Sequence, residues 1–241
     1  MNKPVQTRPV EIGKLREVAA HRLPGRVSAS QQVHDALRAR ILSLELAPGQ
    51  ALSRAEVSET YGVSQTPVRE AMLKLAAEGL LEIFPQSKTE VSRIDITHAQ
   101  ETQFLRLSLE LEVVRRLAEA PDRGFVDEID AMVVRQERAI EAGDMEDFSR
   151  LDREFHRRMQ SLLGAENLWD LVMARSGHID RLRNLNLPDP GKSASIMECH
   201  RRIAAAIRAG DPAAGEAAVR EHLSGTLEKA EDIRDRYPDY F

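Results

Sequence analysis

Apolar residues recur at helical spacing along most of the chain, beginning near its N-terminus. The first stripe consists of Val33, Leu37, Ile41 and Leu44. Such spacing gathers apolar side chains on one face of a helix, so a helix is predicted here. Residues 54–61 predict a second, short helix, which Gly62 can end because glycine readily adopts left-handed backbone conformations.

A third predicted helix follows the turn at Gly62. Ser64 or Thr66 can cap its N-terminus, and Pro67 lies in its first turn, where a missing N–H costs no hydrogen bond. The inward positions are Val68, Met72, Leu75 and Ala76. The outward positions are Gln65, Thr66, Arg69 and Lys74. One face of this helix is therefore apolar, and the opposite face is polar and basic.

A β-hairpin is predicted directly after this helix. Gly79 ends the helix, and residues 80–84 and 89–93 have the pattern of two strands around a turn at 85–88. Helix, turn, helix and hairpin in this order form a winged helix-turn-helix, which places its second helix in the major groove of DNA. Helix–glycine–helix patterns are also common in all-α proteins, but the hairpin and the proline at the helix start favour DNA binding.

The same stretch closely resembles the DNA-binding domain of the GntR family of bacterial transcription regulators. The matching residues are Pro48-Gly49, Gly62-Val63-Ser64, Thr66-Pro67-Val68-Arg69-Glu70-Ala71, Leu75 and Glu78-Gly79-Leu80. They span roughly sixty residues in register, which is far more specific than an isolated helix-turn-helix match. We expect DNA contacts from Arg54, Ser64, Gln65, Thr66, Arg69 and Lys88.

Three positions depart from the family pattern. Gln65 and Ala55 stand where the family usually has arginine, and Lys88 stands where it usually has glycine at the wing tip. Glutamine pairs well with adenine edges, whereas arginine prefers guanine, so we expect an operator that differs at the base facing Gln65. Arg54 is expected to make part of the DNA contact that Ala55, without a charged side chain, cannot make. Lys88 is expected to contact a phosphate or the minor groove.

The rest of the chain is helical by its pattern. Breaks at 121–124, 143–144, 164–167, 187–192 and 210–212 divide residues 97–236 into six amphipathic helices. The predicted fold class is mostly α, with a winged helix-turn-helix domain followed by an antiparallel bundle of six α-helices. The predicted divisions are a flexible N-terminal arm (1–28), a DNA-binding domain (29–93), a linker (94–97) and a helical domain (98–236).

Composition and charge add further limits. The 241 residues are 42% hydrophobic but only 4% aromatic, which suits helices packed on helices. Residues 1–93 carry 13 Lys and Arg against 10 Asp and Glu, and the remainder carries 21 against 29, so nucleic acid belongs at the N-terminal part. The lack of a long apolar run, a signal peptide or a second cysteine beside Cys199 predicts a cytoplasmic protein without a membrane span or disulfide.

A second set of polar residues lies in the helical part. Asp152 and His156 are four residues apart and therefore point the same way on one helix, while His200 and His222 lie on later helices. Each has apolar neighbours at helical spacing, and helical bundles build metal sites from such facing side chains. One carboxylate and three imidazoles suit Zn²⁺, Ni²⁺, Mn²⁺ or Fe²⁺. Spacing alone leaves open that the Asp-x-x-x-His pair is an ordinary surface feature of a helix.

Residues 97–236 resemble the FCD domain, the effector domain of the FadR branch of the GntR family. Six helices are similar to its VanR-type subgroup. The resemblance implies that Asp152, His156, His200 and His222 hold one divalent transition metal ion per chain. It further implies that a small organic acid binds inside the bundle with its carboxylate on or near the metal.

Arg106, on the first predicted helix of the bundle, matches an arginine that helps to bind the effector in this family. The alternative for Arg106 is an ion pair with Glu110, four residues later on the same face. Residues that could line the opposite wall of the pocket are Arg181, Arg183, Asn184 and Asn186. His178 lies outside the motif and is expected at the surface or at a dimer contact.

Together these features predict a ligand-responsive regulator that is not an enzyme and that binds palindromic double-stranded operator DNA as a homodimer. The effector is expected to change DNA affinity. The resemblance to the family implies that it more commonly does so by relieving repression. Two alternatives remain, a metal-dependent enzyme fused to a DNA-binding module and an architectural DNA-binding dimer without an effector. The first lacks a recognisable catalytic motif, and the second leaves four inward polar residues as an unexplained cost.

Overall fold

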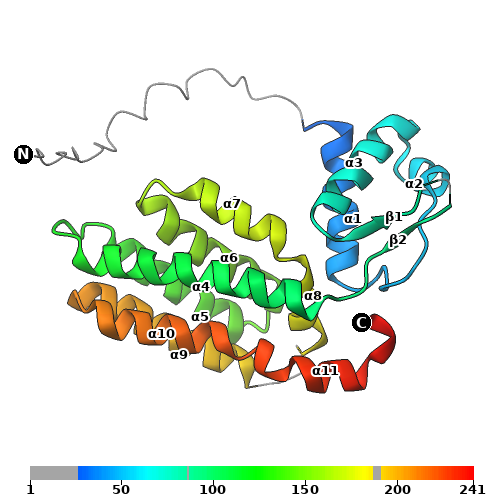
Figure 1. Cartoon of the computed structure of the whole chain (residues 1–241). Helices are drawn as coiled ribbons and strands as arrows, with labels where there is room; N and C mark the ends of the chain where they lie inside the picture. Colours follow the sequence, from blue (N-terminus) through cyan, green and yellow to red (C-terminus); the bar gives the residue numbers. More distant parts are fainter. Residues whose placement is uncertain (1–26, 86, 187–190) are drawn as a thin grey trace, which may run out of the picture.

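The computed structural model describes residues 27–85, 87–186 and 191–241, and it has the two parts that the sequence predicts (Figure 1). A small domain of three helices and a two-stranded hairpin precedes a larger, all-helical domain. The predicted fold class, mostly α with a winged helix-turn-helix domain followed by a helical domain, is therefore confirmed. The predicted N-terminal arm lies outside the described residues, apart from Val27 and Ser28.

The elements of the small domain lie close to their predicted positions. They are α1 (Ala29–Leu42), α2 (Arg54–Tyr61), α3 (Gln65–Ala77), β1 (Leu81–Ile83) and β2 (Thr89–Val91). Ser28 and Ser53 cap α1 and α2, each by accepting the backbone N–H three residues later. Gly62 ends α2 in the left-handed region, with φ 63°, as its position predicts. Leu44 lies beyond the end of α1 and also has a positive φ, 65°.

The core of the small domain forms between α1, α3 and the hairpin. The two strands pair in antiparallel register with Leu81 opposite Val91, and both side chains are buried. Leu37 and Ile41 of α1 pack with Leu75 of α3 in the same fully buried cluster. Burying each such side chain contributes roughly 1.5–3 kcal/mol, so this core fixes α3 and leaves its polar face directed outward.

The larger domain contains eight α-helices among the residues that the structure describes, two more than predicted. They are α4 (Ile96–Glu119), α5 (Val126–Glu141), α6 (Met145–Leu162), α7 (Glu166–Arg175), α8 (Gly177–Leu185), α9 (Lys192–Ala209), α10 (Pro212–Ser224) and α11 (Ala230–Arg236). The difference arises because the fourth predicted helix is broken at Ser176 and the sixth is broken after Ser224.

Each break has a physical reason. At the first, the backbone N–H of Ser176 donates to the carbonyl of Met173, and Gly177 lies against Leu80 so closely that a Cβ there would be 2.5 Å from Leu80 Cδ2. At the second, Gly225 is a poor helix former, and a short 3₁₀ turn at Leu227–Lys229 redirects the chain into α11. Since six helices were the basis of the VanR-type resemblance, the helix number does not support that subgroup.

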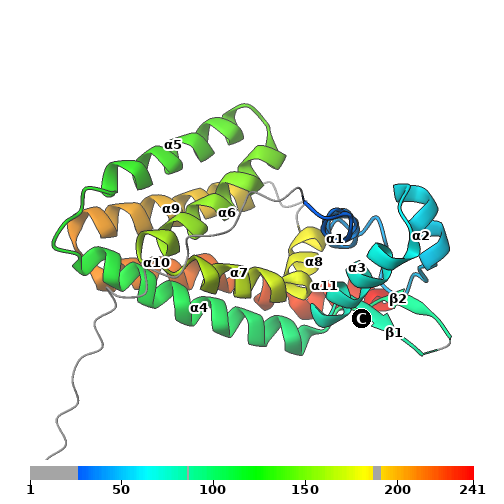
Figure 2. The same ribbon diagram turned by 90° about the horizontal axis from the view of Figure 1, so that it is seen from above.

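The main core of the larger domain lies between α4, α5, α6, α9 and α10. In Figures 1 and 2, α10 runs beside both α4 and α9, and α5 lies beside α6 and α9. Val114 of α4, Phe155 of α6, Ile203 of α9 and Val219 of α10 are all fully buried in one cluster. This packing fixes the facing surfaces of the helices that carry the predicted metal ligands.

Helix α8 joins the helical domain to the small domain (Figure 2). Arg181 is completely buried and donates to the backbone carbonyl of Ser92 (2.6 Å) and to its hydroxyl (3.2 Å). Asn184 donates to the carbonyl of Leu42, the last residue of α1, at 2.6 Å. Hydrogen bonds from α8 therefore reach both the first helix and the end of the hairpin of the small domain.

The C-terminal segment covers the predicted linker from the other side. The backbone N–H of Ile94 donates to the carbonyl of Tyr240 at 2.7 Å, and Ile94 is buried in a cluster with Leu182 of α8 and Ile233 of α11. Asp95 caps α4, which begins at Ile96, by accepting the N–H of His98. The chain between the two domains is therefore docked on both.

His178 is part of this interdomain contact, so its expected location at the surface is wrong. Its side chain is 4% exposed, and Nδ1 accepts the backbone N–H of Asp95 (2.9 Å) and an N–H of Arg181 (3.1 Å). Burial lowers the pKa of His178 to about 3, and the positive charges of Arg181 and His98 act in the same direction. The buried imidazole is therefore neutral in the folded protein at ordinary pH.

This depressed pKa predicts a loss of stability in acid. An unfolded histidine titrates near pH 6.5, so between about pH 6.5 and about pH 3 the unfolded chain binds a proton that folded His178 does not. The unfolding free energy then decreases as pH falls, by up to about 1.4 kcal/mol per pH unit. His178→Asn keeps an acceptor near the position of Nδ1 but cannot titrate. The unfolding free energy of this variant should therefore decrease less steeply as pH falls. Urea unfolding of both proteins with a chelator present, from pH 6.5 to pH 4, measures this; equal slopes would contradict it.

Candidate metal centre and DNA-binding face

The polar face of α3 is exposed as the sequence predicts. Gln65, Thr66 and Arg69 are all exposed, and so is Arg54 at the start of α2. Ser64 is the N-cap residue of α3, although its side chain makes no capping hydrogen bond. A helix N-terminus with free polar side chains can approach both phosphates and base edges, because its backbone N–H groups also favour anions.

Lys88 lies at the tip of the hairpin, between β1 and β2. Its ammonium group pairs with Glu90 and lies 5.2 Å from the centre of the Phe84 ring. Its side chain is about half exposed (51%). A phosphate would therefore compete with Glu90 for this cation.

The four predicted metal ligands come together inside the bundle. Asp152 and His156 lie one turn apart on α6, while His200 and His222 come from α9 and α10, which pack against each other. One ligand atom from each of the four lies within 4.8 Å of all the others. The Nε2 atom of His222 is 3.0 Å from that of His156 and 3.4 Å from that of His200. An Asp152 oxygen is 3.5 Å from His200 Nε2.

Two further buried side chains orient the imidazoles. His156 Nδ1 lies 2.8 Å from a carboxylate oxygen of Glu110, and His200 Nδ1 lies 2.6 Å from the side-chain oxygen of Gln136. Because Gln136 offers an acceptor, we assign the ring proton of His200 to Nδ1. The Glu110 carboxylate lies within ion-pair distance of His156 Nδ1, but the two atoms do not have hydrogen-bond geometry. The Nε2 atoms of both rings face His222 and Asp152. Carboxylates and amides behind metal-ligating histidines commonly have this role.

The protonation states also suit a cation. Burial lowers the pKa of His200 to about 3 and, together with the charges of His200 and His156, holds that of His222 well below its usual value. Burial alone would raise the pKa of Asp152, but the charges of His156, His200 and Arg106 outweigh it and lower this pKa. The site thus combines neutral imidazoles at His200 and His222 with an ionised Asp152 carboxylate.

The residues fit a bound metal ion. With its proton on Nδ1, His200 offers a lone pair at Nε2, and the Asp152 oxygen 3.5 Å away is also an acceptor, so two acceptors face each other in a buried space. Such an arrangement is unfavourable without a positive charge between the atoms. His222 Nδ1 is itself buried without a hydrogen-bond partner among the described residues. Three nitrogens and a carboxylate oxygen are the donor set that divalent transition metals bind.

Arg106 lies beside this cluster but has a partner in the protein. Its Nε donates to Glu110 at 2.6 Å, which is the alternative that the sequence left open. Both side chains are buried, and the guanidinium lies 5.6 Å from the centre of the Trp169 ring. Burial alone would raise the pKa of Glu110, but Arg106 and His156 outweigh it and keep this carboxyl ionised. Glu110 therefore links Arg106 to the back of His156.

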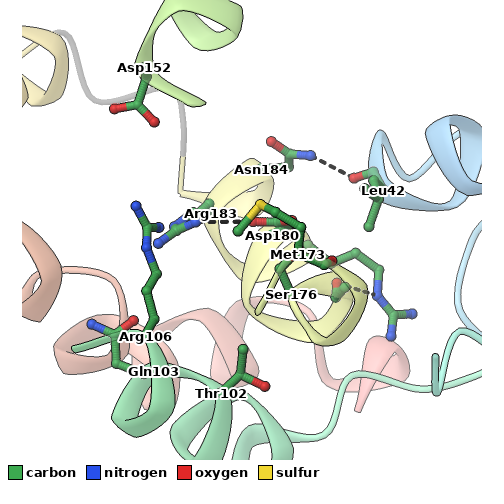
Figure 3. Close-up of polar contacts among 12 residues, drawn as sticks. Leu42, Thr102, Gln103, Arg106, Asp152, Met173, Ser176, Asp180, Arg183 and Asn184 are labelled. Carbon is green, nitrogen blue, oxygen red and sulfur yellow. Dashed lines mark hydrogen bonds and ion pairs between the residues drawn. The ribbon is translucent and has the colours of Figure 1, made fainter. Parts of the chain in front are cut away.

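The four residues proposed for the opposite wall have different positions. Arg183 extends toward Arg106 and Asp152 and pairs with Asp180 at 3.0 Å (Figure 3). Arg181 and Asn184 instead bond to the small domain. Asn186 is buried at the end of α8. Of these four residues, Arg183 is the one that interacts electrostatically with Asp152 and Arg106 within the described part of the chain.

Sequence reasoning missed Gln136 and gave Glu110 only a pairing role. A usable signal existed for Gln136, because a polar residue lies on the apolar stripe of α5 between Val133 and Ala139. Glu110 lies on the same stripe of α4 as Arg106 and Val113. Cys199, next to His200, is buried, and burial raises the pKa of its thiol, which disfavours the reactive thiolate.

An exposed recognition helix on a winged domain, joined to a bundle with an internal Asp/His₃ cluster, defines a DNA-binding protein whose second domain is equipped to bind metal. Comparison with known proteins gives the family. Residues 29–91 match the model of bacterial regulatory proteins of the gntR family, and residues 101–225 match the FCD domain. The chain belongs to the GntR family and is a transcriptional regulator of the GntR/FCD type.

Individual relatives agree. The chain is 40% identical over 205 residues to an HTH-type transcriptional regulator of Streptomyces ambofaciens, covering 85% of this chain and 86% of the relative. It is 31% identical over 212 residues to the transcriptional repressor RspR of Escherichia coli, covering 88% and 93%. The fold is similar to that of E. coli McbR/YncC, with a TM-score of 0.68 at 23% identity, covering 88% of this chain and all of that one. None of the described helices is long and apolar enough to cross a membrane.

The contact between Glu110 and His156 gives a test of the metal centre. Glu110→Gln removes the charge behind His156, and loss of such a supporting partner typically lowers metal affinity about 10- to 100-fold. Glu112→Gln, on the same helix but partly exposed and paired with Arg115 and Arg116, is the matched control and should bind metal normally. Competition with a chromogenic chelator measures both affinities. Equal affinities in the two variants would contradict the role of Glu110, provided that both melt at similar temperatures.

Proposed function

We propose that this regulator is a repressor whose affinity for operator DNA is controlled by a small organic acid bound at the Asp152/His156/His200/His222 cluster. The observation that supports it most is this cluster of convergent ligand atoms, since an inert dimerisation domain has no need of it. The proposal places the protein on bacterial DNA in the cytoplasm. Family membership favours it over a DNA-targeted enzyme, and the relative RspR is named a repressor.

The four ligands would hold one divalent ion per chain, either zinc, nickel, manganese or iron. When bound, this ion supplies a fixed positive charge and an open coordination position for a carboxylate oxygen. Asp152 and the three histidines would hold it in place, with Gln136 bonded to the far nitrogen of His200 and the Glu110 carboxylate beside the far nitrogen of His156. Arg106, which is already bound to Glu110, adds a second cation beside the site.

We propose that the outward residues of α3 make the base contacts, with Arg54, Ser64 and Thr66 fixing the helix on the DNA backbone. Gln65 and Arg69 are exposed on this helix and long enough to reach base edges. Lys88, half exposed at the wing tip, is proposed to contact a phosphate or the minor groove.

The glutamine at position 65 predicts the base preference. Sites selected from random DNA by the native protein should favour adenine at the base pair facing Gln65, and Gln65→Arg should change this preference to guanine. A bidentate contact of this kind gives about 1–3 kcal/mol of discrimination, or about 5- to 150-fold in affinity. Selection of guanine by both proteins would contradict the prediction. Arg69→Ala is the comparison variant, because it removes a different proposed contact from the same helix.

We propose that the protein binds DNA as a homodimer, because two winged domains can read the two halves of a palindrome. Phe104 of α4 is 74% exposed, and Leu168 and Leu171 of the adjoining α7 are also exposed, so these helices offer apolar surface to a second copy. Light scattering should give the mass of two chains, and Phe104→Glu should shift the protein toward the monomer. A native protein that remains monomeric at micromolar concentration and on its operator would contradict this.

The central experiment is a titration of operator binding with simple carboxylates. For the metal-loaded protein, at least one small organic acid should weaken binding of a labelled operator, by roughly 5- to 150-fold for a typical coupling free energy. The same acid should have no effect on His200→Ala, which lacks a metal ligand but keeps the DNA-binding domain. An acid that binds the native bundle without changing operator affinity would contradict ligand control.

A further inference from the structure

Arg183 and Asn184 connect two different parts of the molecule although they are neighbours on α8. Arg183 extends into the space beside Asp152 and Arg106, whereas Asn184 holds the carbonyl of Leu42 on the small domain (Figure 3). A movement of this short helix that alters one contact must therefore affect the other.

A series of polar contacts continues from Arg183 to the recognition helix. Asp180 accepts from Arg183 with one oxygen, at 3.0 Å, and from the hydroxyl of Ser176 with the other. Ser176 lies at the junction of α7 and α8, where it is buried. The guanidinium of Arg38, on α1, donates to Ser176 Oγ (3.4 Å) and to the carbonyl of Met173 (2.7 Å).

The same Arg38 reaches α3. Its Nε donates to Glu78 at 3.0 Å, and the other Glu78 oxygen lies 2.6 Å from Nε2 of His34. Glu78 is the C-cap residue of α3, the helix that carries the proposed base contacts. The guanidinium of Arg38 therefore bonds both to the α7–α8 junction and to the residue that ends the recognition helix.

The charges beside the metal cluster favour an anion near Arg183. Arg183 and Arg106 repel each other across this space, and burial together with this repulsion lowers the pKa of Arg183. Asp180 is the one carboxylate that Arg183 contacts within ion-pair distance in the described part of the chain, and the Arg183 side chain is 27% exposed. An incoming carboxylate can therefore reach Arg183 and compete with Asp180 for its N–H groups.

We propose that Arg183 is a second effector-binding residue, and that its transfer from Asp180 to the carboxylate of the effector loosens the Asp180–Ser176–Arg38–Glu78 connection to the recognition helix. The inference rests on the proposed function, since it concerns the same effector. It assigns Arg183 to effector binding and Asp180, Ser176 and Arg38 to signal transmission. These consecutive contacts form a physical route from Arg183 to Glu78 at the end of α3. The experiment must demonstrate that the two ends of this route are energetically coupled.

The test compares operator affinity and its response to carboxylates in the full-length, metal-loaded protein. Asp180→Asn weakens the connection without any ligand, so it should reduce operator affinity by about 2- to 30-fold and reduce the further effect of acid. Asp170→Asn is the matched control, because Asp170 is an exposed carboxylate on neighbouring α7 that pairs with Arg157. Arg183→Gln should weaken binding of the acid, measured by calorimetry, as well as the response. The probes are acetate, succinate, citrate and gluconate.

Thermal melting establishes that each variant is folded. A double-mutant cycle of Asp180→Asn with Arg38→Gln then measures the coupling, and the paired effects should be clearly less than additive. Native operator affinity in Asp180→Asn, additive effects in the cycle, or native binding of acid by Arg183→Gln would each overturn the inference. If no acid affects the native protein, the proposed ligand control fails instead, and the ligand-free affinity of Asp180→Asn still decides whether the connection exists.

Discussion

The close approach of three imidazole nitrogens inside the helical bundle is the electrostatic constraint on which the rest of the structure depends. His222 Nε2 lies 3.0 Å from that of His156 and 3.4 Å from that of His200, while Glu110 and Gln136 occupy the opposite ring nitrogens of these two partners. Acceptors that face one another in a buried space favour a positive charge between them. The helices that hold these residues are the same ones that form the main hydrophobic core, so the packing of the bundle keeps the ligands together.

Helix α8 connects this site to the DNA-binding domain through direct side-chain contacts. One of its faces carries Arg183 toward the metal cluster, while Arg181 and Asn184 bond to the small domain. The break at Ser176 makes α8 a short separate element rather than the end of a long helix. A short helix anchored at both ends can shift between two arrangements, which is what ligand control of DNA affinity needs.

Much of the architecture could be predicted because it depends on local signals. The structure has Gly62 at the predicted left-handed position and the hairpin directly after α3, and Ser64 is the N-cap residue of α3, although its side chain makes no capping hydrogen bond. The four candidate ligands could be chosen from helical spacing together with the family resemblance, and the structure brings their atoms together.

Other features depended on tertiary contacts that no local pattern shows. The break at Ser176 follows from the close packing of Gly177 on Leu80, nearly a hundred positions away in the chain. His178 is buried because α8 docks on the small domain, and the pairing of Arg183 with Asp180 became visible only with the orientation of that helix. The most direct test of the account is an anomalous diffraction map from crystals of protein purified without an affinity metal. The account predicts one strong peak within about 2.0–2.2 Å of the three Nε2 atoms and of an Asp152 oxygen. No peak there, even after soaking in zinc, nickel or manganese salts, would contradict it.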